Sequence, residues 1–269
     1  MTSSTEQNPP LVDVQQLSVG YTAGKPLLED ISFSIFPREI FAIMGPSGCG
    51  KTTLFKHLIG LKRPQSGDLR VLDHSLAASS KEKLFDVRKK IGVAFQHGAL
   101  INSMNLIENV ELPLVEHTRL DKMTIRIMSR MKLEMMGLLD AENLMPAQLS
   151  GGMLKRAGLA RAVVMDPQIL FFDEPSAGLD PGASAELDDL LLQLRELLNI
   201  TIIIVTHDLD SAFKVADRVL MLAEGKIAAL GSVEQLKQSE SAVVQSLLQR
   251  RSSRERLSGD AYIEQLTHD

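Results

Sequence analysis

The sequence predicts an α/β fold: a mostly parallel sheet, an antiparallel β-subdomain before it, and a helical insertion within the chain. Two continuous apolar runs, 169–172 and 201–205, are typical of strands buried on both faces. Between them, a segment after Pro181 repeats leucine at helical spacing, at Leu187, Leu190, Leu191, Leu194 and either Leu197 or Leu198. A third apolar run, 40–44, leads through a glycine-rich loop into another helical segment that ends near Gly60. Together these features predict a parallel α/β core.

The flanking elements follow in chain order. Residues 1–10 are polar and end in Pro-Pro, so we expect a disordered N-terminus before a main domain over 11–231. Short strands are predicted at 11–17, 31–35, 67–72 and 91–95.

Helical and hairpin segments make up the rest of the chain. The stretch 106–136 is mostly helix-forming, which predicts a helical insertion at about 97–160. Residues 219–222 and 226–229, joined across Glu224-Gly225, are typical of a hairpin. A polar, helical C-terminal extension and tail are expected over 232–269.

Composition narrows the class of protein. The chain of 269 residues is 44% hydrophobic and 23% charged, which is ordinary for a soluble globular protein. A single cysteine excludes an internal disulfide and a cysteine-based metal cluster. A net charge of −5 and an aromatic content of 4% argue against nucleic acid as a partner. No apolar run is long enough to span a bilayer and no secretory signal is present, so we expect a cytoplasmic chain unless a partner holds it at a membrane.

The glycine-rich loop fits the pattern G-x-x-x-x-G-K-[ST], with residues Gly45, Pro46, Ser47, Gly48, Cys49, Gly50, Lys51, Thr52 and Thr53. Its glycines let backbone N–H groups point inward, and the helix N-terminus adds positive charge for phosphates. We expect Lys51 to reach the β- and γ-phosphates and the Thr52 hydroxyl to face Mg²⁺. The preceding strand and following helix argue against a chance glycine turn. The sequence therefore predicts a P-loop NTPase core that binds a nucleoside triphosphate.

The lone cysteine within this loop has two interpretations. A helix N-terminus and the nearby Lys51 lower a thiol pKa, which would make Cys49 reactive. Alternatively, Cys49 is a small residue that fills space. The residue pattern favours neither.

Two acids follow the apolar run 169–172. A buried strand delivers Asp173 to the carboxyl edge of the sheet, where open α/β sheets bind ligands. We expect Asp173 to hold Mg²⁺ and Glu174 to orient and deprotonate the attacking water. Alternatively, the two acids could cap the N-terminus of a helix.

A second phosphate cradle is predicted at Leu149-Ser150-Gly151-Gly152-Met153. Ser150 can cap the helix that follows, and the glycines expose N–H groups at its start. Because the chain has one nucleotide loop, the economical explanation is a symmetric dimer in which each subunit lends this helix end to the other's nucleotide. A simple capped helix is the alternative.

In their order, these motifs resemble the ATP-binding cassette (ABC) family over almost all of residues 11–231. The resemblance implies an ATPase in which 45–52 is the Walker A loop, 149–153 the signature and 177–180 the D-loop. It also implies that Tyr21 stacks on adenine, Gln96 senses Mg²⁺ and the membrane partner, and His207 contacts the γ-phosphate. The signature usually ends in glutamine, whereas this chain has Met153, whose side chain cannot donate a hydrogen bond. The backbone cradle is unaffected.

A narrower resemblance is to the ATPases of the Mla (maintenance of lipid asymmetry) phospholipid transporters. It rests on the methionine-ended signature and on residues 97–100, 104–105, 108–110, 113–114, 116–118 and 155–157. It implies a homodimer at the cytoplasmic face of the inner membrane of a Gram-negative bacterium, moving phospholipids between the inner and outer membranes. The implied partners are transmembrane permease subunits, an MCE-type lipid-binding subunit and a small STAS-domain protein.

Two other functions share parts of this pattern. The ATPase of an importer for another small solute carries every catalytic motif, and only the stretch 96–118 argues against it. A soluble ABC ATPase acting on ribosomes or DNA usually has tandem cassettes or a long coiled coil, and this acidic chain has neither.

Two apolar segments remain as candidate contact surfaces. Residues 98–101 and 106–107 would either line a groove for a permease helix or belong to the core of the insertion. In the tail, residues 262–266 would contact the partner subunit, form a disordered end, or fold on their own subunit.

Overall fold

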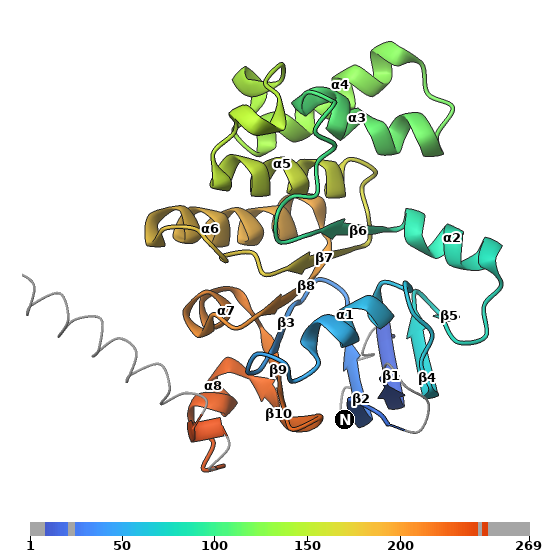
Figure 1. The fold of residues 1–269 in the computed structure, drawn as a ribbon, viewed down its shortest axis with the longest axis vertical. Helices are drawn as coiled ribbons and strands as arrows, with labels where there is room; N and C mark the ends of the chain where they lie inside the picture. Colours follow the sequence, from blue (N-terminus) through green and yellow to red (C-terminus); the bar gives the residue numbers. More distant parts are fainter. Residues whose placement is uncertain (1–8, 21–24, 242–243, 247–269) are drawn as a thin grey trace, which may run out of the picture.

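The predicted α/β fold with a mostly parallel core sheet is confirmed. The computed structural model describes residues 9–20, 25–241 and 244–246. Tyr21 and the tail segment 262–266 lie outside the described residues. Figure 1 shows a group of helices from residues 106–163 at the top, the core sheet running from the middle of the molecule to its bottom, and the strands of a second, antiparallel sheet at the lower right.

The core sheet has the strand order β10-β9-β3-β8-β7-β6. All neighbouring strands pair in parallel except β10, which returns along β9 through the predicted hairpin at Glu224-Gly225. The strands are β3 (Ile40–Met44), β6 (Ile91–Ala94), β7 (Ile169–Asp173), β8 (Thr201–Thr206), β9 (Arg218–Ala223) and β10 (Lys226–Ser232). The central strands β3 and β8 are buried along their whole length, which explains their unbroken apolar sequences.

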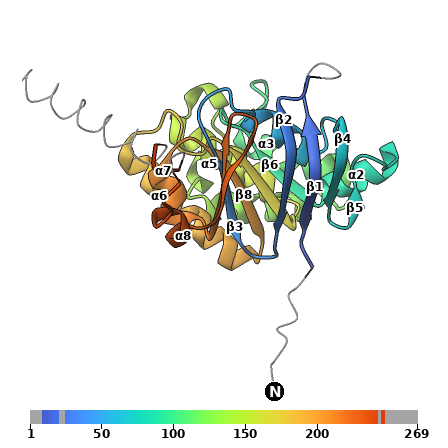
Figure 2. The ribbon, with the colours of Figure 1, turned by 90° about the horizontal axis from the view of Figure 1, so that it is seen from below.

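A second, antiparallel sheet has the order β2-β1-β4-β5. Its strands are β1 (Val12–Val19), β2 (Leu28–Ile35), β4 (Ser66–Val71) and β5 (His74–Ser75). Figure 2 shows β1, β2 and β4 side by side along one flank of the molecule. The backbone N–H of Glu29 donates to the Gly225 carbonyl at 2.9 Å, which joins this sheet to the hairpin of the core sheet.

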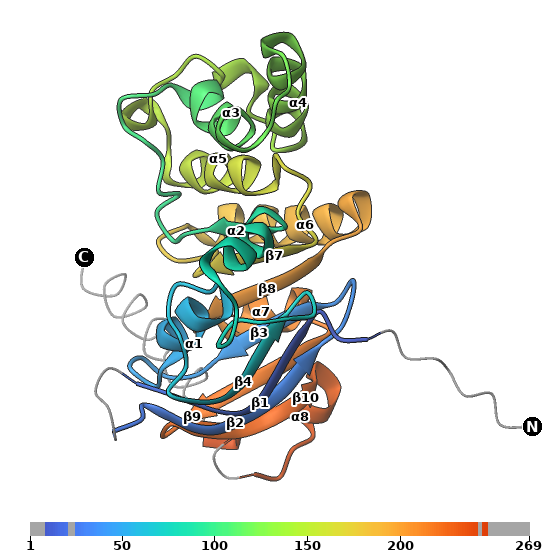
Figure 3. The ribbon, with the colours of Figure 1, turned by 90° about the vertical axis from the view of Figure 1, so that its right-hand side faces the viewer.

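Helix α1 (Lys51–Leu58) fills the space between the two sheets (Figure 3). Its buried side chains Leu54, Phe55 and Leu58 pack against both sheets, and Phe55 meets Phe171 of β7 edge-on at 6.1 Å. The helix ends at Leu58, and the expected stop, Gly60, follows its C-cap with a φ of +71°.

Helices α5 (Gly151–Val163), α6 (Pro181–Leu198) and α7 (Leu209–Val215) cover the opposite face of the core sheet. Along α6, Leu187, Leu191 and Leu194 are buried as expected. Of the two alternatives at the helix end, Leu198 packs against the core, whereas Leu197 is 70% exposed. Alternate residues of each core strand therefore face α1 or these helices.

The helical region contains α3 (Leu106–His117), α4 (Lys122–Met135) and α5, with short 3-10 turns at Leu139–Ala141 and Pro146–Gln148. The α3 helix begins with a capping box formed by Asn105 and Glu108. Leu106 and Ile107 are almost fully buried, so they belong to the core rather than to an open groove.

The sequence analysis did not predict β5, α2 (Lys81–Lys89) or α7. These elements are short or mostly exposed, so their hydrophobic patterns are weak. A short helix α8 (Val233–Lys237) follows β10. Among the described helices, none combines the length and apolar composition needed to cross a bilayer.

Candidate functional site

Three neighbouring parallel strands bring the predicted site residues to one edge of the core sheet. The phosphate loop follows β3, Asp173 ends β7 and is followed by Glu174, and His207 comes directly after β8. Since β8 pairs with both β3 and β7, the carboxyl ends of all three strands are adjacent. Open α/β sheets bind their ligands in a crevice at this edge.

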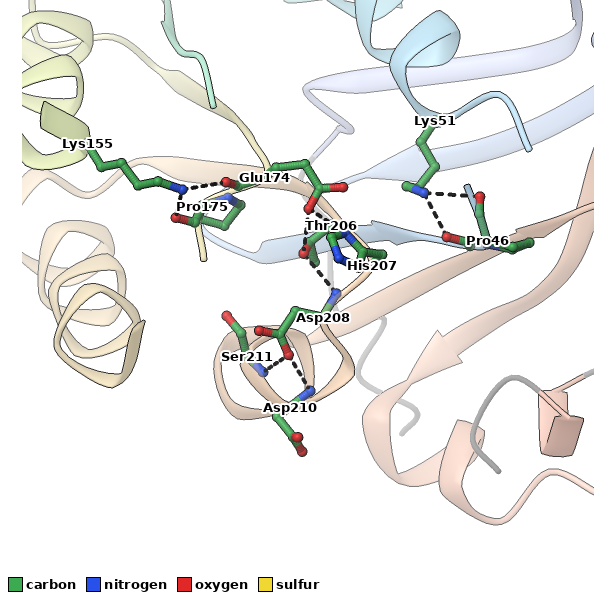
Figure 4. Close-up of polar contacts among 11 residues, drawn as sticks. Pro46, Lys51, Lys155, Glu174, Pro175, Thr206, His207, Asp208, Asp210 and Ser211 are labelled. Atoms are coloured by element: carbon green, nitrogen blue, oxygen red, sulfur yellow. Dashed lines mark hydrogen bonds and ion pairs between the residues drawn. The ribbon is translucent and has the colours of Figure 1, made fainter. Parts of the chain in front are cut away.

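The phosphate loop has a backbone that only glycine adopts readily. Gly45, Gly48 and Gly50 have φ values of +153°, +81° and +108°. At Gly45, an added Cβ would lie 2.4 Å from the Leu222 carbonyl oxygen, so the loop packs directly against β9. Lys51 bends back over the loop, and its Nζ donates to the carbonyls of Gly45 at 2.7 Å and Pro46 at 3.2 Å (Figure 4).

The remaining loop side chains differ in exposure. Ser47 and Thr52 are exposed, whereas Cys49 and Thr53 are buried. Burial raises the pKa of the Cys49 thiol, and the nearby Lys51 charge only partly opposes it. Burial and the raised pKa favour the space-filling interpretation of Cys49 over the reactive, low-pKa thiol.

The two acids after β7 have different surroundings. Asp173 is half-buried, and burial raises the pKa of its carboxyl group. The adjacent Glu174 charge raises this pKa further, whereas the Lys51 and Lys56 charges only partly lower it. Glu174 points its Oε2 toward β8, where it accepts hydrogen bonds from the Thr206 hydroxyl at 3.2 Å and His207 Nδ1 at 2.9 Å. The carboxylate of Glu174 is thus oriented by two side chains.

Glu174 also has an unusual backbone. Its φ is +50°, a left-handed conformation that a non-glycine residue adopts only where its surroundings hold it. Its N–H donates to the Val205 carbonyl at 2.7 Å. On the other side, Lys155 Nζ donates to the carbonyls of Glu174 at 2.9 Å and Pro175 at 2.5 Å. Burial lowers the pKa of Lys155 to about 8, against the raising effect of the Glu174 charge.

Thr206 and Lys155 were not among the predicted site residues. Thr206 is the last residue of the buried strand β8 and directly precedes His207. This position, at the end of a core strand and next to a predicted site residue, could have identified it from the sequence. Lys155 lies within residues 155–157, which contribute to the resemblance to the Mla ATPases, and no role at the site was predicted for it. Its signal is a lysine on the buried side of α5, among Ala157, Gly158 and Leu159.

The predicted second cradle forms the start of α5. Ser150 caps the helix, its hydroxyl accepting from the Met153 N–H at 3.2 Å. Gly151 and Gly152 form the first turn, and an added Cβ on Gly152 would meet no heavy atom of the described chain within 4 Å. The helix α5 and the phosphate loop's helix α1 cover opposite faces of the core sheet, so one subunit does not bring its two cradles together.

Gln96 follows β6 and is half-buried. The loop after it is fixed to α5: Arg161 donates to the carbonyls of Ala99 at 2.9 Å and Gly98 at 3.0 Å. At Gly158 an added Cβ would lie 2.8 Å from the Gly98 Cα. The structure therefore gathers Lys51, Asp173, Glu174 and His207 at one edge, with Gln96 on a loop braced by the signature helix.

The family model for the ABC transporter matches residues 28–177. The chain is 40% identical, over 87% of its length and 88% of the relative's, to "Intermembrane phospholipid transport system ATP-binding protein MlaF" of Haemophilus influenzae. It is 39% identical, over 88% of its length and 68% of the relative's, to "Probable ribonucleotide transport ATP-binding protein mkl" of Mycobacterium leprae.

A solved structure shares the fold. It is the ATP-binding cassette MJ0796, in a dimeric post-hydrolysis state bound to ADP and Pi. The TM-score is 0.76 and the identity 30%, over 82% of this chain and 98% of that one.

Proposed function

This chain belongs to the ABC transporter family, and we propose that it is the ATP-hydrolysing subunit of a transporter that moves phospholipids between the inner and outer membranes of a Gram-negative bacterium. The observation that carries this proposal is the similarity to an intermembrane phospholipid transport ATP-binding protein, which covers 87% of this chain. A second candidate cargo is a small solute, which the similarity to a probable ribonucleotide transport protein favours.

ATP binds at the loop formed by Gly45, Pro46, Ser47, Gly48, Cys49, Gly50, Lys51, Thr52 and Thr53 in this proposal. The Lys51 ammonium, which now donates to two carbonyls of its own loop, exchanges these acceptors for phosphate oxygens. Backbone N–H groups at the start of α1 and the helix dipole supply the rest of the anion site. Tyr21 would stack on adenine.

The residues at the sheet edge fit a magnesium ion held mainly by oxygen. Within the described residues, no three His, Cys, Asp or Glu side chains gather as a closed metal site. Mg²⁺ suits such a place because it keeps several waters and takes few protein ligands beside phosphates. Thr52, Gln96 and Asp173 would hold it, and the ion would neutralise charge on the β- and γ-phosphates.

Glu174 is the general base. Its carboxylate takes a proton from the water that attacks the γ-phosphorus, and the bond from this phosphorus to the β,γ-bridging oxygen breaks, so that ADP leaves. The hydrogen bonds from Thr206 and His207 hold the carboxylate in place for this step. His207, which is exposed, can turn its other ring nitrogen toward the γ-phosphate. Gln96 would report the state of this site to the membrane partner.

The catalytic unit is a homodimer in this proposal. The start of α5 is not covered by other parts of the same subunit. Gly152 has a backbone conformation that any residue could adopt, and a Cβ added there would meet no heavy atom of the described chain within 4 Å. A glycine there costs helix stability relative to alanine, so its use indicates close approach by something outside the subunit. The partner's nucleotide, held by Ser150, Gly151 and Gly152, explains it, and the similar cassette MJ0796 is dimeric.

The chain would act at the cytoplasmic face of the inner membrane, bound to transmembrane permease subunits. Phe95 and Ile101, each 37% exposed, lie on either side of Gln96 and the start of its loop, and in this proposal they contact a permease helix. An MCE-type lipid-binding subunit and a small STAS-domain protein complete the proposed assembly.

The test is co-purification of the tagged chain from native membranes, followed by identification of the bound proteins and mass spectrometry of the lipids. Phospholipid enrichment over the total membrane extract, and ATP turnover that responds to added phospholipid, would support the proposal. Turnover that responds to ribonucleotides or another solute, with no lipid enrichment, would favour the second candidate. Purification with ribosomes or DNA would contradict both.

A further inference from the structure

A buried lysine on the signature helix contacts the turn that carries the general base. Lys155 is 5% exposed, one turn into α5. Its Nζ donates to two consecutive backbone carbonyls, those of Glu174 and Pro175. Burying an ammonium group is costly unless hydrogen bonds compensate, so these two bonds define where the side chain must lie.

The contact falls on a residue whose backbone is strained. The left-handed φ of Glu174 persists only if its neighbours hold it in place. The N–H of Glu174 is held by the Val205 carbonyl on β8, and the carbonyl of Glu174 is held by Lys155 on α5. The peptide groups on both sides of the Glu174 Cα are therefore anchored, which sets the direction of the carboxylate toward Thr206 and His207.

We propose that Lys155 is a positioning residue for hydrolysis: it holds the turn at Glu174 and Pro175 so that the Glu174 carboxylate faces the crevice. The inference rests on the proposed function, in which Glu174 is the base. It also links the two nucleotide sites of the dimer. Lys155 joins the base of its own site to α5, and in the proposed homodimer the start of α5, Ser150 to Gly152, would contact the partner's nucleotide.

A purely structural role for Lys155 makes a different prediction, and the chain offers a matched control. Lys132 on α4 is also buried, at 8% exposure, and pairs with Asp166 at 2.6 Å, away from the sheet edge. If buried lysines here only support packing, replacing either one lowers stability and leaves the chemical step alone. A positioning role affects turnover only at Lys155.

The experiment compares wild type, Lys155→Met, Lys155→Arg and Lys132→Met as full-length chains. For Lys155→Met we expect kcat for ATP hydrolysis to fall roughly 10- to 100-fold, with KM changed less than about twofold. Arginine keeps N–H donors for both carbonyls, so Lys155→Arg should recover most of the loss. Lys132→Met should stay within about twofold of wild type in kcat.

Two further measurements do not depend on normal turnover. Hydrogen exchange of the nucleotide-free protein should be faster in the peptide covering 173–178 for Lys155→Met, and unchanged there for Lys132→Met. In a Glu174→Gln background, adding Lys155→Met should lower the residual rate no further, because the two residues act as one unit.

The proposal is overturned by a normal kcat in Lys155→Met, by a raised KM with unchanged kcat, or by failure of arginine to rescue. Lys155→Gln covers the case in which methionine prevents folding. If both neutral variants lose their cooperative thermal transition, Lys155 is a core residue and the proposal fails. A wild-type chain without ATP turnover would instead contradict the proposed function, and the exchange measurement would still test the Lys155 contact.

Discussion

His207 donates through Nδ1 to Glu174 Oε2 at 2.9 Å, across a sequence separation of 33 residues. The bond joins the ends of β7 and β8, and Thr206 donates to the same oxygen. One carboxylate oxygen is thus occupied by oriented donors. We infer that these two hydrogen bonds hold the Glu174 side chain in one orientation, in which its carboxylate can contact the attacking water.

Glu174→Gln should abolish turnover while ATP binding is retained. An amide cannot take a proton from the attacking water, so we expect a loss of roughly 10²- to 10⁴-fold in kcat. ATP should then lock the dimer, which size-exclusion chromatography with ATP present would detect. The control is Asp189→Asn, which removes a surface carboxylate paired with Lys214. Near-normal hydrolysis by Glu174→Gln would remove Glu174 from its role.

Gly152→Ala should separate dimer function from subunit stability. A Cβ added at Gly152 meets open space within the subunit. The free energy of unfolding of the isolated chain should therefore stay the same or rise by up to about 1 kcal/mol. ATP-dependent dimerisation and hydrolysis should be lost if the partner's nucleotide packs against this glycine.

Gly158→Ala is the contrasting change on the same helix. Its Cβ would lie 2.8 Å from the Gly98 Cα, so the loop after Gln96 must shift. We expect a destabilisation of about 1–3 kcal/mol in a urea melt of the subunit alone. Equal behaviour of the two alanine variants would contradict both predictions.

Ser211→Ala should lower stability in a pH-dependent way. The buried Ser211 hydroxyl donates to the buried Asp188 carboxylate at 2.5 Å, joining α7 to α6. Burial raises the Asp188 pKa above its usual 3.8, Asp208 and Asp189 raise it further, and Ser211 and Lys214 lower it. Removing the donor leaves a buried charge less satisfied, which costs about 1–3 kcal/mol.

The sign of the pH effect follows from the direction of that shift. Since the folded state holds the Asp188 proton more tightly than the unfolded state, this group lowers stability as pH rises above about 3.8. Loss of the Ser211 donor raises the folded-state pKa further. The difference in unfolding free energy between wild type and Ser211→Ala should be largest at neutral pH. It should shrink as pH falls through the raised pKa of Asp188 toward 3.8. Urea melts at several pH values measure it, and a gap that widens in acid would be inconsistent with this account.

Cys49 should react slowly in the folded protein. Its thiol is buried and its pKa is raised, so both access and thiolate content are low. We expect maleimide labelling to be at least about tenfold slower in native than in urea-unfolded protein at the same pH. Equal rates in the two states would show that the loop opens freely. Because the sequence contains one cysteine, labelling reports this site alone.

Ile101→Asp should weaken permease binding without affecting the isolated subunit. Ile101 is partly exposed on the loop after Gln96, whereas its neighbour Leu100 packs against the core. A charge there should reduce co-purification with the permease while melting temperature and ATP binding stay near wild type. Leu197→Asp on α6, at a residue 70% exposed, is the control. Unchanged co-purification would exclude this loop from the interface.

The sequence by itself determined the core sheet, the phosphate loop and the acids at the end of β7. Buried parallel strands require unbroken apolar runs, and the loop requires glycines followed by a lysine at a helix start. These constraints are local, so residues 40–53 and 169–174 carry them in order along the chain. Short or exposed elements such as α2 and α7 have few buried positions, and no comparable pattern marked them.

Only the tertiary structure decided what depends on contacts between distant segments. The Cys49 thiol lies beside a helix start and a lysine, which in sequence indicate a low pKa, but burial between the sheets reverses the direction. Leu106 and Ile107 could have faced a groove until α3 packed them into the core. The role proposed for Lys155 depends on the fold, which places α5 against the turn after β7. The two acceptors of Lys155, the carbonyls of Glu174 and Pro175, lie 19 and 20 residues further along the chain. Burial and hydrogen bonding across such separations are set by how the layers pack, and sequence spacing does not encode them.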